Sequence, residues 1–160
     1  MASTISSANL KVTIKETIEL NGKDRGSTNT LTVGSINEVD NRIVTIPSGS
    51  QTTLFNLSNN PSAGTFTSSS LKYARITNKD DSNHVRLRVS SSLSLSGSGT
   101  PSAIDFKIEA GKSFLLSNSS ISGSTDGLDL NSTFNYGEIK SLKAEPSGSD
   151  IDVELFLAST

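Results

Sequence analysis

Near its start the chain reads Leu10-Lys11-Val12-Thr13-Ile14-Lys15-Glu16-Thr17-Ile18-Glu19-Leu20, and this pattern decides the fold. Apolar residues recur at every second position, with polar residues between them. Because successive side chains of a β-strand point to opposite faces, the alternation predicts a half-buried strand. Glu16 interrupts the apolar side and is interpreted as a bulge or a strand end. Asn21-Gly22 follows directly and predicts a tight turn, since both residues accept the positive φ angles that such a turn needs.

The same alternation recurs along the rest of the chain. Over residues 85–95 the apolar residues keep one parity, while Arg86 and Arg88 lie on the other side. Gly111 is predicted to turn the chain between strands at 104–110 and 114–116. No segment has the helical spacing of apolar residues, and the abundant serine, threonine and β-branched residues are poor helix formers. Further strands are predicted over residues 29–36, 41–46, 52–57, 71–78, 139–144 and 151–157.

Many short strands separated by turn signals predict an all-β protein, a single antiparallel β-sandwich that is jelly-roll-like. Periodicity alone does not separate this fold from an immunoglobulin-like sandwich, although the Cys…Trp…Cys core of the latter is absent. A chain of 160 residues fits one domain. We expect that domain to cover residues 9–160, after a flexible N-terminal arm at 1–8 that becomes ordered on a partner. Loops rich in Ser, Gly, Asn and Pro are predicted over residues 59–70, 96–103 and 117–127.

Composition excludes several classes of protein. The 14 basic and 16 acidic residues give a net charge of −2, which argues against nucleic-acid binding. The chain has no cysteine, so it has no disulfide framework. No apolar run reaches the ~18 residues of a membrane span. The opening residues lack the basic and apolar regions of a signal peptide, so we expect a soluble protein that is made in a cytoplasm.

The candidate catalytic and metal-binding residues are few. His84 follows Asp80 and Asp81, but no Gly-x-Ser-x-Gly motif accompanies it, and we interpret it as a surface residue at a strand start. Residues 78–83 resemble a calcium loop, yet the sixth and twelfth positions of an EF-hand loop fall on Asn83 and Val89. The acidic pair in residues 126–129 is interpreted as an Asp-Gly turn. We therefore expect no enzymatic activity, no cofactor and no metal.

Two regions are candidates for contact with a partner protein. Arg86 and Arg88 share a sheet face and are suited to an acidic partner, although cross-strand pairing with carboxylates is the alternative. The C-terminal strand, with Asp150, Asp152 and Glu154, is predicted to guard an open sheet edge, and the strand at 85–95 lacks such acidic residues. The second region is the N-terminal arm, with contact residues Ser3, Thr4 and Ile5.

Four segments carry a resemblance to a known group of proteins. They are residues 36–47 (INEVDNRIVTIP), 71–78 (LKYARITN), 108–114 (IEAGKSF) and the ending at 152–160. Together they resemble small β-rich virion proteins of tailed bacteriophages, particularly phages of marine bacteria. The resemblance implies a structural role in the virion, as a capsid decoration (cement) protein or a tail accessory protein, with a jelly-roll-like fold. It also implies capsid or tail proteins as partners and a homotrimeric state.

Two other classes of function remain open. A tail- or fibre-associated module that binds a receptor or carbohydrate requires exposed aromatic residues in its loops, and Phe66 and Tyr136 are the candidates. A small hydrolase is disfavoured by the single histidine and the absence of cysteine.

Overall fold

The computed structural model describes residues 6–57, 65–66, 70–91, 103–117, 122–124 and 136–160. These residues form strands and turns, and among them no helix is long and apolar enough to cross a membrane. In chain order the strands are β1 (Ala8–Lys15), β2 (Glu19–Leu20), β3 (Lys23–Asp24), β4 (Thr28–Ile36), β5 (Glu38–Ile46), β6 (Thr52–Leu57), β7 (Thr65–Phe66), β8 (Leu71–Asn78), β9 (Val85–Ser91), β10 (Ala103–Ile108), β11 (Ser113–Ser117), β12 (Ser122–Ser124), β13 (Tyr136–Pro146) and β14 (Ile151–Ser159).

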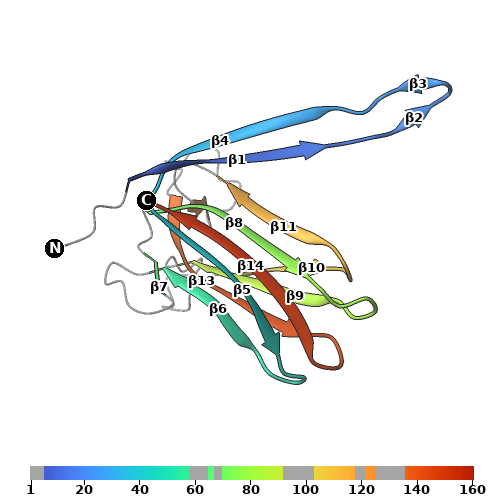
Figure 1. Cartoon of the computed structure of the whole chain (residues 1–160). Coiled ribbons are helices and arrows are strands. Elements are labelled where there is room, and N and C mark those ends of the chain that lie inside the picture. Colours follow the sequence, from blue (N-terminus) through green and yellow to red (C-terminus); the bar gives the residue numbers. More distant parts are fainter. Residues whose placement is uncertain (1–5, 58–64, 67–69, 92–102, 118–121, 125–135) are drawn as a thin grey trace, which may run out of the picture.

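Two packed antiparallel sheets form the body of the molecule (Figure 1). Among the described strands, one sheet has the order β11-β8-β14-β5, and the other contains the order β10-β9-β13-β6. Among these eight strands, the first in the chain pairs with the last, the second with the second-to-last, and likewise toward the middle. The pairs are β5 with β14, β6 with β13, β8 with β11 and β9 with β10. This pairing is that of a long hairpin rolled into two sheets, which is the jelly-roll architecture. The predicted antiparallel, jelly-roll-like β-sandwich is confirmed.

The main core lies between the two sheets. In β14 the alternating residues Ile151, Val153, Leu155 and Leu157 are at most 1% exposed, and they pack in one cluster with Phe55 and other residues of the facing sheet. Burying an aliphatic side chain of this size stabilises the fold by about 1.5–3 kcal/mol. The period-two pattern of the sequence therefore corresponds to one buried face on each sheet.

Most predicted strand limits agree with the structure. The strands predicted over 52–57 and 71–78 are β6 and β8. The strand predicted over residues 10–20 is interrupted as expected, since β1 ends at Lys15, immediately before Glu16. Asn21 and Gly22 form the predicted turn with φ angles of 54° and 70°, and Gly111 turns the chain with a φ of 68°. Local turn chemistry and alternation are thus sufficient to place these elements.

The predicted edge position of the C-terminal strand is wrong. β14 lies between β8 and β5 and pairs with both, so Asp152 and Glu154 do not protect an open edge. The strand that begins at Val85 is also internal, because β9 pairs with both β10 and β13. Alternation reports which face of a strand is buried, but it carries no information on the neighbours of that strand.

Residues 8–36 form a hairpin that belongs to neither sheet of the body (Figure 1). β1 pairs with β4, and β2 pairs with β3 near the tip. Only Asn37 separates β4 from β5, and Ser35 adopts a left-handed φ of 60° beside this junction. Of the predicted N-terminal arm, residues 1–5 lie outside the described residues, and β1 already begins at Ala8. The structure therefore consists of a jelly-roll body and a projecting hairpin, which the sequence pattern did not distinguish.

Candidate functional site

The base of the hairpin is fixed to the outer face of the β11-β8-β14-β5 sheet. There the rings of Tyr73 and Phe156 meet edge to face, with 6.0 Å between their centroids. Ala158 is fully buried beside them. This second hydrophobic cluster consists of Ile36, Tyr73 and Ala158, with Leu10, Val12, Val33 and Phe156 packed against them. The hairpin thus has a firm apolar attachment to the body.

The apolar face of the hairpin continues well beyond this attachment. Leu10 lies opposite Val33, Val12 opposite Leu31, and Leu20 opposite Lys23, so one register runs from the base to the tip. In a continuous ribbon, residues of the same parity share a face. The apolar residues outside the base cluster are nevertheless exposed: Ile14 by 50%, Ile18 by 54%, Leu20 by 57% and Leu31 by 41%. We call these four residues the uncovered stripe.

The opposite face of the hairpin is polar. It carries Asn9, Lys11, Thr13 and Lys15 on β1, and threonines 28, 30 and 32 on β4. Thr13 and Thr30 lie opposite each other, with 3.4 Å between their hydroxyl oxygens. The hairpin is therefore amphipathic along its length, although the body covers only the base of its apolar face.

Polar contacts stiffen the middle of the hairpin. The Glu16 amide donates to the Ser27 carbonyl over 2.8 Å, and the Ser27 hydroxyl donates to the Glu16 carboxylate over 2.5 Å. Gly26 passes so close that a Cβ atom there would lie 2.3 Å from the Glu16 carbonyl oxygen. The Gly26 amide also donates to the Asp24 carboxylate over 2.8 Å. These contacts hold the distal part of the hairpin as an ordered ribbon.

Two basic residues flank the uncovered stripe near the tip. Lys23 lies opposite Leu20, and the Arg25 amide donates to the Ile18 carbonyl over 2.9 Å. Both basic side chains are exposed, and neither forms an ion pair with another described residue. The apolar face of the tip thus carries two available positive charges.

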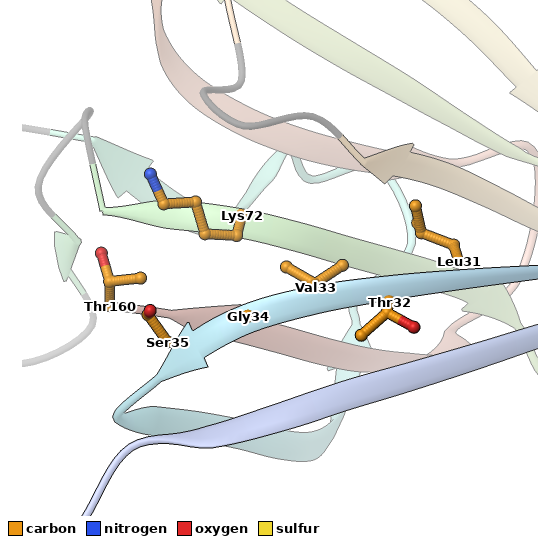
Figure 2. A pocket seen from close by; sticks show the side chains of 7 residues that line it. All are labelled: Leu31, Thr32, Val33, Gly34, Ser35, Lys72 and Thr160. Atoms are coloured by element: carbon orange, nitrogen blue, oxygen red, sulfur yellow. The ribbon is translucent and has the colours of Figure 1, made fainter.

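A groove of about 450 Å³ lies beside the hairpin base. Figure 2 shows Leu31 and Val33 on the side of β4 that faces β8, whereas Thr32 points away. The remaining lining residues are Gly34, Ser35, Lys72 and Thr160. The groove is adjacent to the uncovered stripe, because Leu31 belongs to both.

The outer face of the body has a second exposed apolar region, on the edge strand β5. Val39 is 53% exposed and Ile43 is 63% exposed. Ile43 lies opposite Glu154, and Thr45 lies opposite Asp152, whose carboxylate accepts a 2.6 Å hydrogen bond from the Thr45 hydroxyl. We call Val39, Ile43, Thr45 and Asp152 the β5–β14 patch. Asp80, Asp81 and Asp150 line a shallow hollow together with Thr45, Asp152 and one basic residue, Lys79, so carboxylates outnumber basic groups beside the patch.

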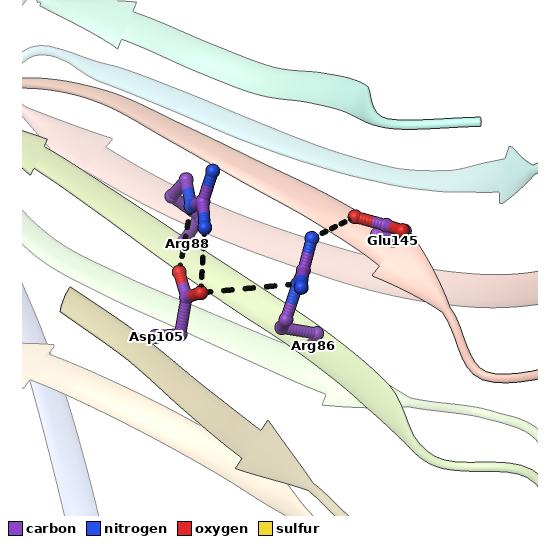
Figure 3. Close-up of polar contacts among 4 residues, drawn as sticks. All are labelled: Arg86, Arg88, Asp105 and Glu145. Carbon is purple, nitrogen blue, oxygen red and sulfur yellow. Dashed lines mark hydrogen bonds and ion pairs between the residues drawn. The ribbon is translucent and has the colours of Figure 1, made fainter. Parts of the chain in front are cut away.

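Arg86 and Arg88 lie on the outer face of the other sheet, where they pair with carboxylates of their own chain (Figure 3). Arg88 donates two 2.7 Å hydrogen bonds to Asp105. Arg86 pairs with Glu145, and its Nε lies 3.9 Å from Asp105. The hydrogen bonds from Arg88 hold the pKa of Asp105 below its ordinary value and raise the pKa of Arg88. This cross-strand pairing is the alternative that the sequence left open, and the contact with an acidic partner stays a prediction.

His84 and its neighbouring carboxylates lie in the turn between β8 and β9, where His84 is half-buried immediately before β9. The His84 carbonyl accepts the Ser147 amide at 3.0 Å. The Asp80 carboxylate accepts the amides of Ser82 and Asn83 at 2.8 and 2.6 Å, which lowers its pKa. It therefore stabilises its own loop. Within the described ranges, no three His, Cys, Asp or Glu side chains are grouped so as to hold a metal ion.

Phe66 is not the exposed loop aromatic that a carbohydrate-binding surface requires. It is 7% exposed, and its ring meets that of Phe55 edge to face at 6.5 Å. The short strand β7, parallel to β6, carries it into the main core. The loop composition around Phe66 concealed this strand, since Ser, Gly and Pro dominate there.

The remaining candidates fall outside the described part of the chain. These are the contact residues Ser3, Thr4 and Ile5, the turn at residues 126–129 and the side chain of Tyr136. Comparison of the chain with models of protein families, with curated proteins and with solved structures gave no match.

Proposed function

We propose that this chain is a non-enzymatic structural protein of a bacteriophage virion, where it binds the outside of the capsid as a decoration protein. Its partners in this proposal are capsid proteins and further copies of itself in a trimer. It is made in the host cytoplasm and resides in the virion, and it contacts neither nucleic acid nor a membrane. The jelly roll is compatible with this role, since viral capsid domains use the same architecture. A fold alone does not define a function, so the proposal depends on the site.

The observation that carries the proposal is the uncovered stripe. Ile14, Ile18 and Leu20 are each at least 50% exposed on an ordered ribbon that projects from the body. Clustered exposed apolar side chains with a polar border are typical of protein–protein interaction surfaces. A ribbon whose opposite face is fully polar is suited to lie against a second protein surface. The phage context comes from the resemblance of residues 36–47, 71–78 and 108–114 to virion proteins.

Quantitative mass spectrometry of purified particles tests the proposal. We expect this chain at a constant copy ratio to the major capsid protein across gradient fractions of intact particles. A matched preparation with Ile18→Asp and Leu20→Asp tests the role of the hairpin, and we expect lower occupancy. Absence of the chain from particles that otherwise assemble normally contradicts the proposal.

A test of the predicted contact through Arg86 and Arg88 needs substitutions that leave the sheet intact. Reversal of both charges to glutamate brings four carboxylates together, the two new ones and those of Asp105 and Glu145, and this disturbs the sheet itself. Arg86→Gln with Arg88→Gln removes the positive charge but keeps hydrogen-bonding groups. We expect this variant to fold and to bind particles less tightly. Unchanged occupancy rejects this contact while leaving the role of the hairpin intact.

A further inference from the structure

We propose that the uncovered stripe of one copy lies on the β5–β14 patch of a second copy of the same chain. The inference rests on the proposed function only in treating the hairpin as a protein-binding element. It specifies the occupant, and it concerns the purified protein without any particle.

The first argument is continuity with an interface that already exists. Leu10, Val12 and Val33 of the hairpin pack on the outer face of the β11-β8-β14-β5 sheet of their own chain. This sheet leaves Val39 and Ile43 exposed on the same outer face, while the hairpin leaves its distal apolar residues exposed. The apolar face of the hairpin and the outer face of this sheet, which already pack together at the base, therefore each have a further apolar region. Neither further region is covered by another described residue.

The hairpin does not reach the patch of its own chain. Ile18 and Leu20 remain 54% and 57% exposed, so no part of the described body covers them. Figure 1 shows the tip, with β2 and β3, running away from the end of β5. A second copy can supply the missing surface, since its patch is equally uncovered.

The spacing of the apolar residues agrees on the two surfaces. Ile14 of β1 and Ile18, which lies between β1 and β2, are four residues apart along the hairpin, as are Val39 and Ile43 on β5. At ~3.3 Å per residue each pair spans about 13 Å. The side chains of the first pair share one face of the hairpin ribbon and those of the second share one face of β5, so Ile14 can meet Val39 while Ile18 meets Ile43.

Charge complementarity sets the direction. With Ile18 on Ile43, the tip points toward the end of the patch where Asp152 and Asp150 lie, in a hollow whose carboxylates outnumber its one basic residue, Lys79. Lys23 and Arg25 flank the stripe at the tip and have no ion pair with any described residue. Glu16 is the carboxylate on this face of the hairpin, and the Ser27 hydroxyl donates to it. Opposite charges across an interface fix register and orientation more than affinity.

The contact joins two different surfaces, so it is heterologous unless a two-fold axis makes it reciprocal. Such contacts close into rings when the rotation between copies permits. A ring of three copies agrees with the trimer of the proposed function.

Disulfide trapping tests this contact without interference, because the chain has no cysteine. Full-length Ile18→Cys protein is mixed with Ile43→Cys protein that carries a mass tag, and the mixture is oxidised mildly. We expect a mixed disulfide between the two. Thr17→Cys is the matched control, since Thr17 is the exposed neighbour of Ile18 on the polar face, and we expect at least tenfold less product with Ile43→Cys. Equal yields from Thr17→Cys and Ile18→Cys overturn the inference.

Sedimentation velocity with charge reversal provides a second test. We expect the wild-type chain to self-associate, Arg25→Glu to weaken that association at least tenfold, and Asp152→Arg in the same chain to restore it. A wild-type chain that stays monomeric at all concentrations overturns the inference. If that monomer still binds particles through its hairpin, the proposed function stands. If the chain self-associates as expected but is absent from particles, the proposed function fails and the inference stands.

Discussion

Val12 and Ile18 lie on the same face of one hairpin, yet Val12 packs against the buried cluster around Tyr73 and Ile18 is 54% exposed. Both residues alternate with polar neighbours in the same way. The difference arises from the body, which extends beneath the base of the hairpin but not beneath its tip. Val12 therefore shows what the apolar face of the hairpin contributes to folding, and Ile18 shows which part of that face is available for binding.

Substitution of these two residues by alanine should have unequal effects on folding. Val12→Ala removes packed methyl groups and should lower the free energy of unfolding by about 1–2 kcal/mol. Ile18→Ala changes an exposed residue and should stay within about 0.5 kcal/mol of the wild type. Urea denaturation of the full chain at low protein concentration measures both. A larger loss for Ile18→Ala than for Val12→Ala contradicts the position of the hairpin.

Gly26 should be essential for the distal part of the hairpin. In Gly26→Ala the new Cβ lies 2.3 Å from a backbone carbonyl oxygen of Glu16, so the ribbon must open there. The expected result is faster hydrogen exchange of amides around residues 16–27, with an almost unchanged thermal midpoint of the body. Gly34→Ala is the control on the same face, because its Cβ approaches only the Asn9 side chain at 3.4 Å. Equal exchange rates in the two variants argue against the close passage at Gly26.

Asn78 should be the most sensitive polar residue of the body. It is fully buried, and its side-chain amide donates to the carbonyls of Asn83 and Ile108 at 2.8 and 3.2 Å. Its side-chain oxygen accepts the Asp80 amide at 3.0 Å. Asn78→Ala leaves these groups unpaired and should cost about 2–3 kcal/mol in urea denaturation.

Asn83→Ala is the matched comparison for this substitution. It removes a 3.1 Å hydrogen bond to the Ser149 hydroxyl at the surface and should cost less than about 1 kcal/mol. A similar loss in the two variants shows that Asn78 does not organise the turns around it.

The pair of Arg88 and Asp105 should give a defined pH dependence. Hydrogen bonds from Arg88 lower the pKa of Asp105 in the folded state. A lowered pKa means that this carboxylate adds stability above its unfolded pKa of about 3.9, and that the gain is lost as the pH falls through the folded value. Between about pH 5 and 7 the carboxylate is ionised in both the folded and the unfolded state. The urea midpoint of the wild type should therefore exceed that of Asp105→Asn by a constant amount over this range.

Below about pH 4 that difference should shrink, and 1 M salt should reduce it at neutral pH because the pair is exposed to solvent. Urea titrations at a series of pH values measure it. A difference that persists unchanged to about pH 2 excludes the charged pair as its source.

The period of the sequence was sufficient to predict the sandwich. Each buried strand face, such as that of Ile151, Val153 and Leu155, is encoded within a few consecutive residues. The turns at Asn21-Gly22 and Gly111 are equally local, since they depend on the φ angles of single residues. Local signals of this kind are readable without knowledge of the rest of the chain.

The candidate site depended on information that is not local. Leu10 and Leu20 alternate with polar residues in the same manner, and only the extent of the body decides which of them is covered. The internal positions of β9 and β14 arise from pairing between distant segments. Arg86 and Arg88 were correctly placed on one face, but their carboxylate partners come from β10 and β13. The one signal in the sequence that could have indicated a long ribbon was the length of the alternation over residues 10–20.

Hydrogen–deuterium exchange at two protein concentrations tests the central claim most directly, that the tip of the hairpin binds the β5–β14 patch of another copy. At a concentration where the full chain is associated, we expect slower exchange than in the dilute chain at residues 16–27 and along β5, with no change in β9 or β10. Exchange in the hairpin tip and β5 that is independent of concentration, or protection confined to β9 and β10, contradicts the claim.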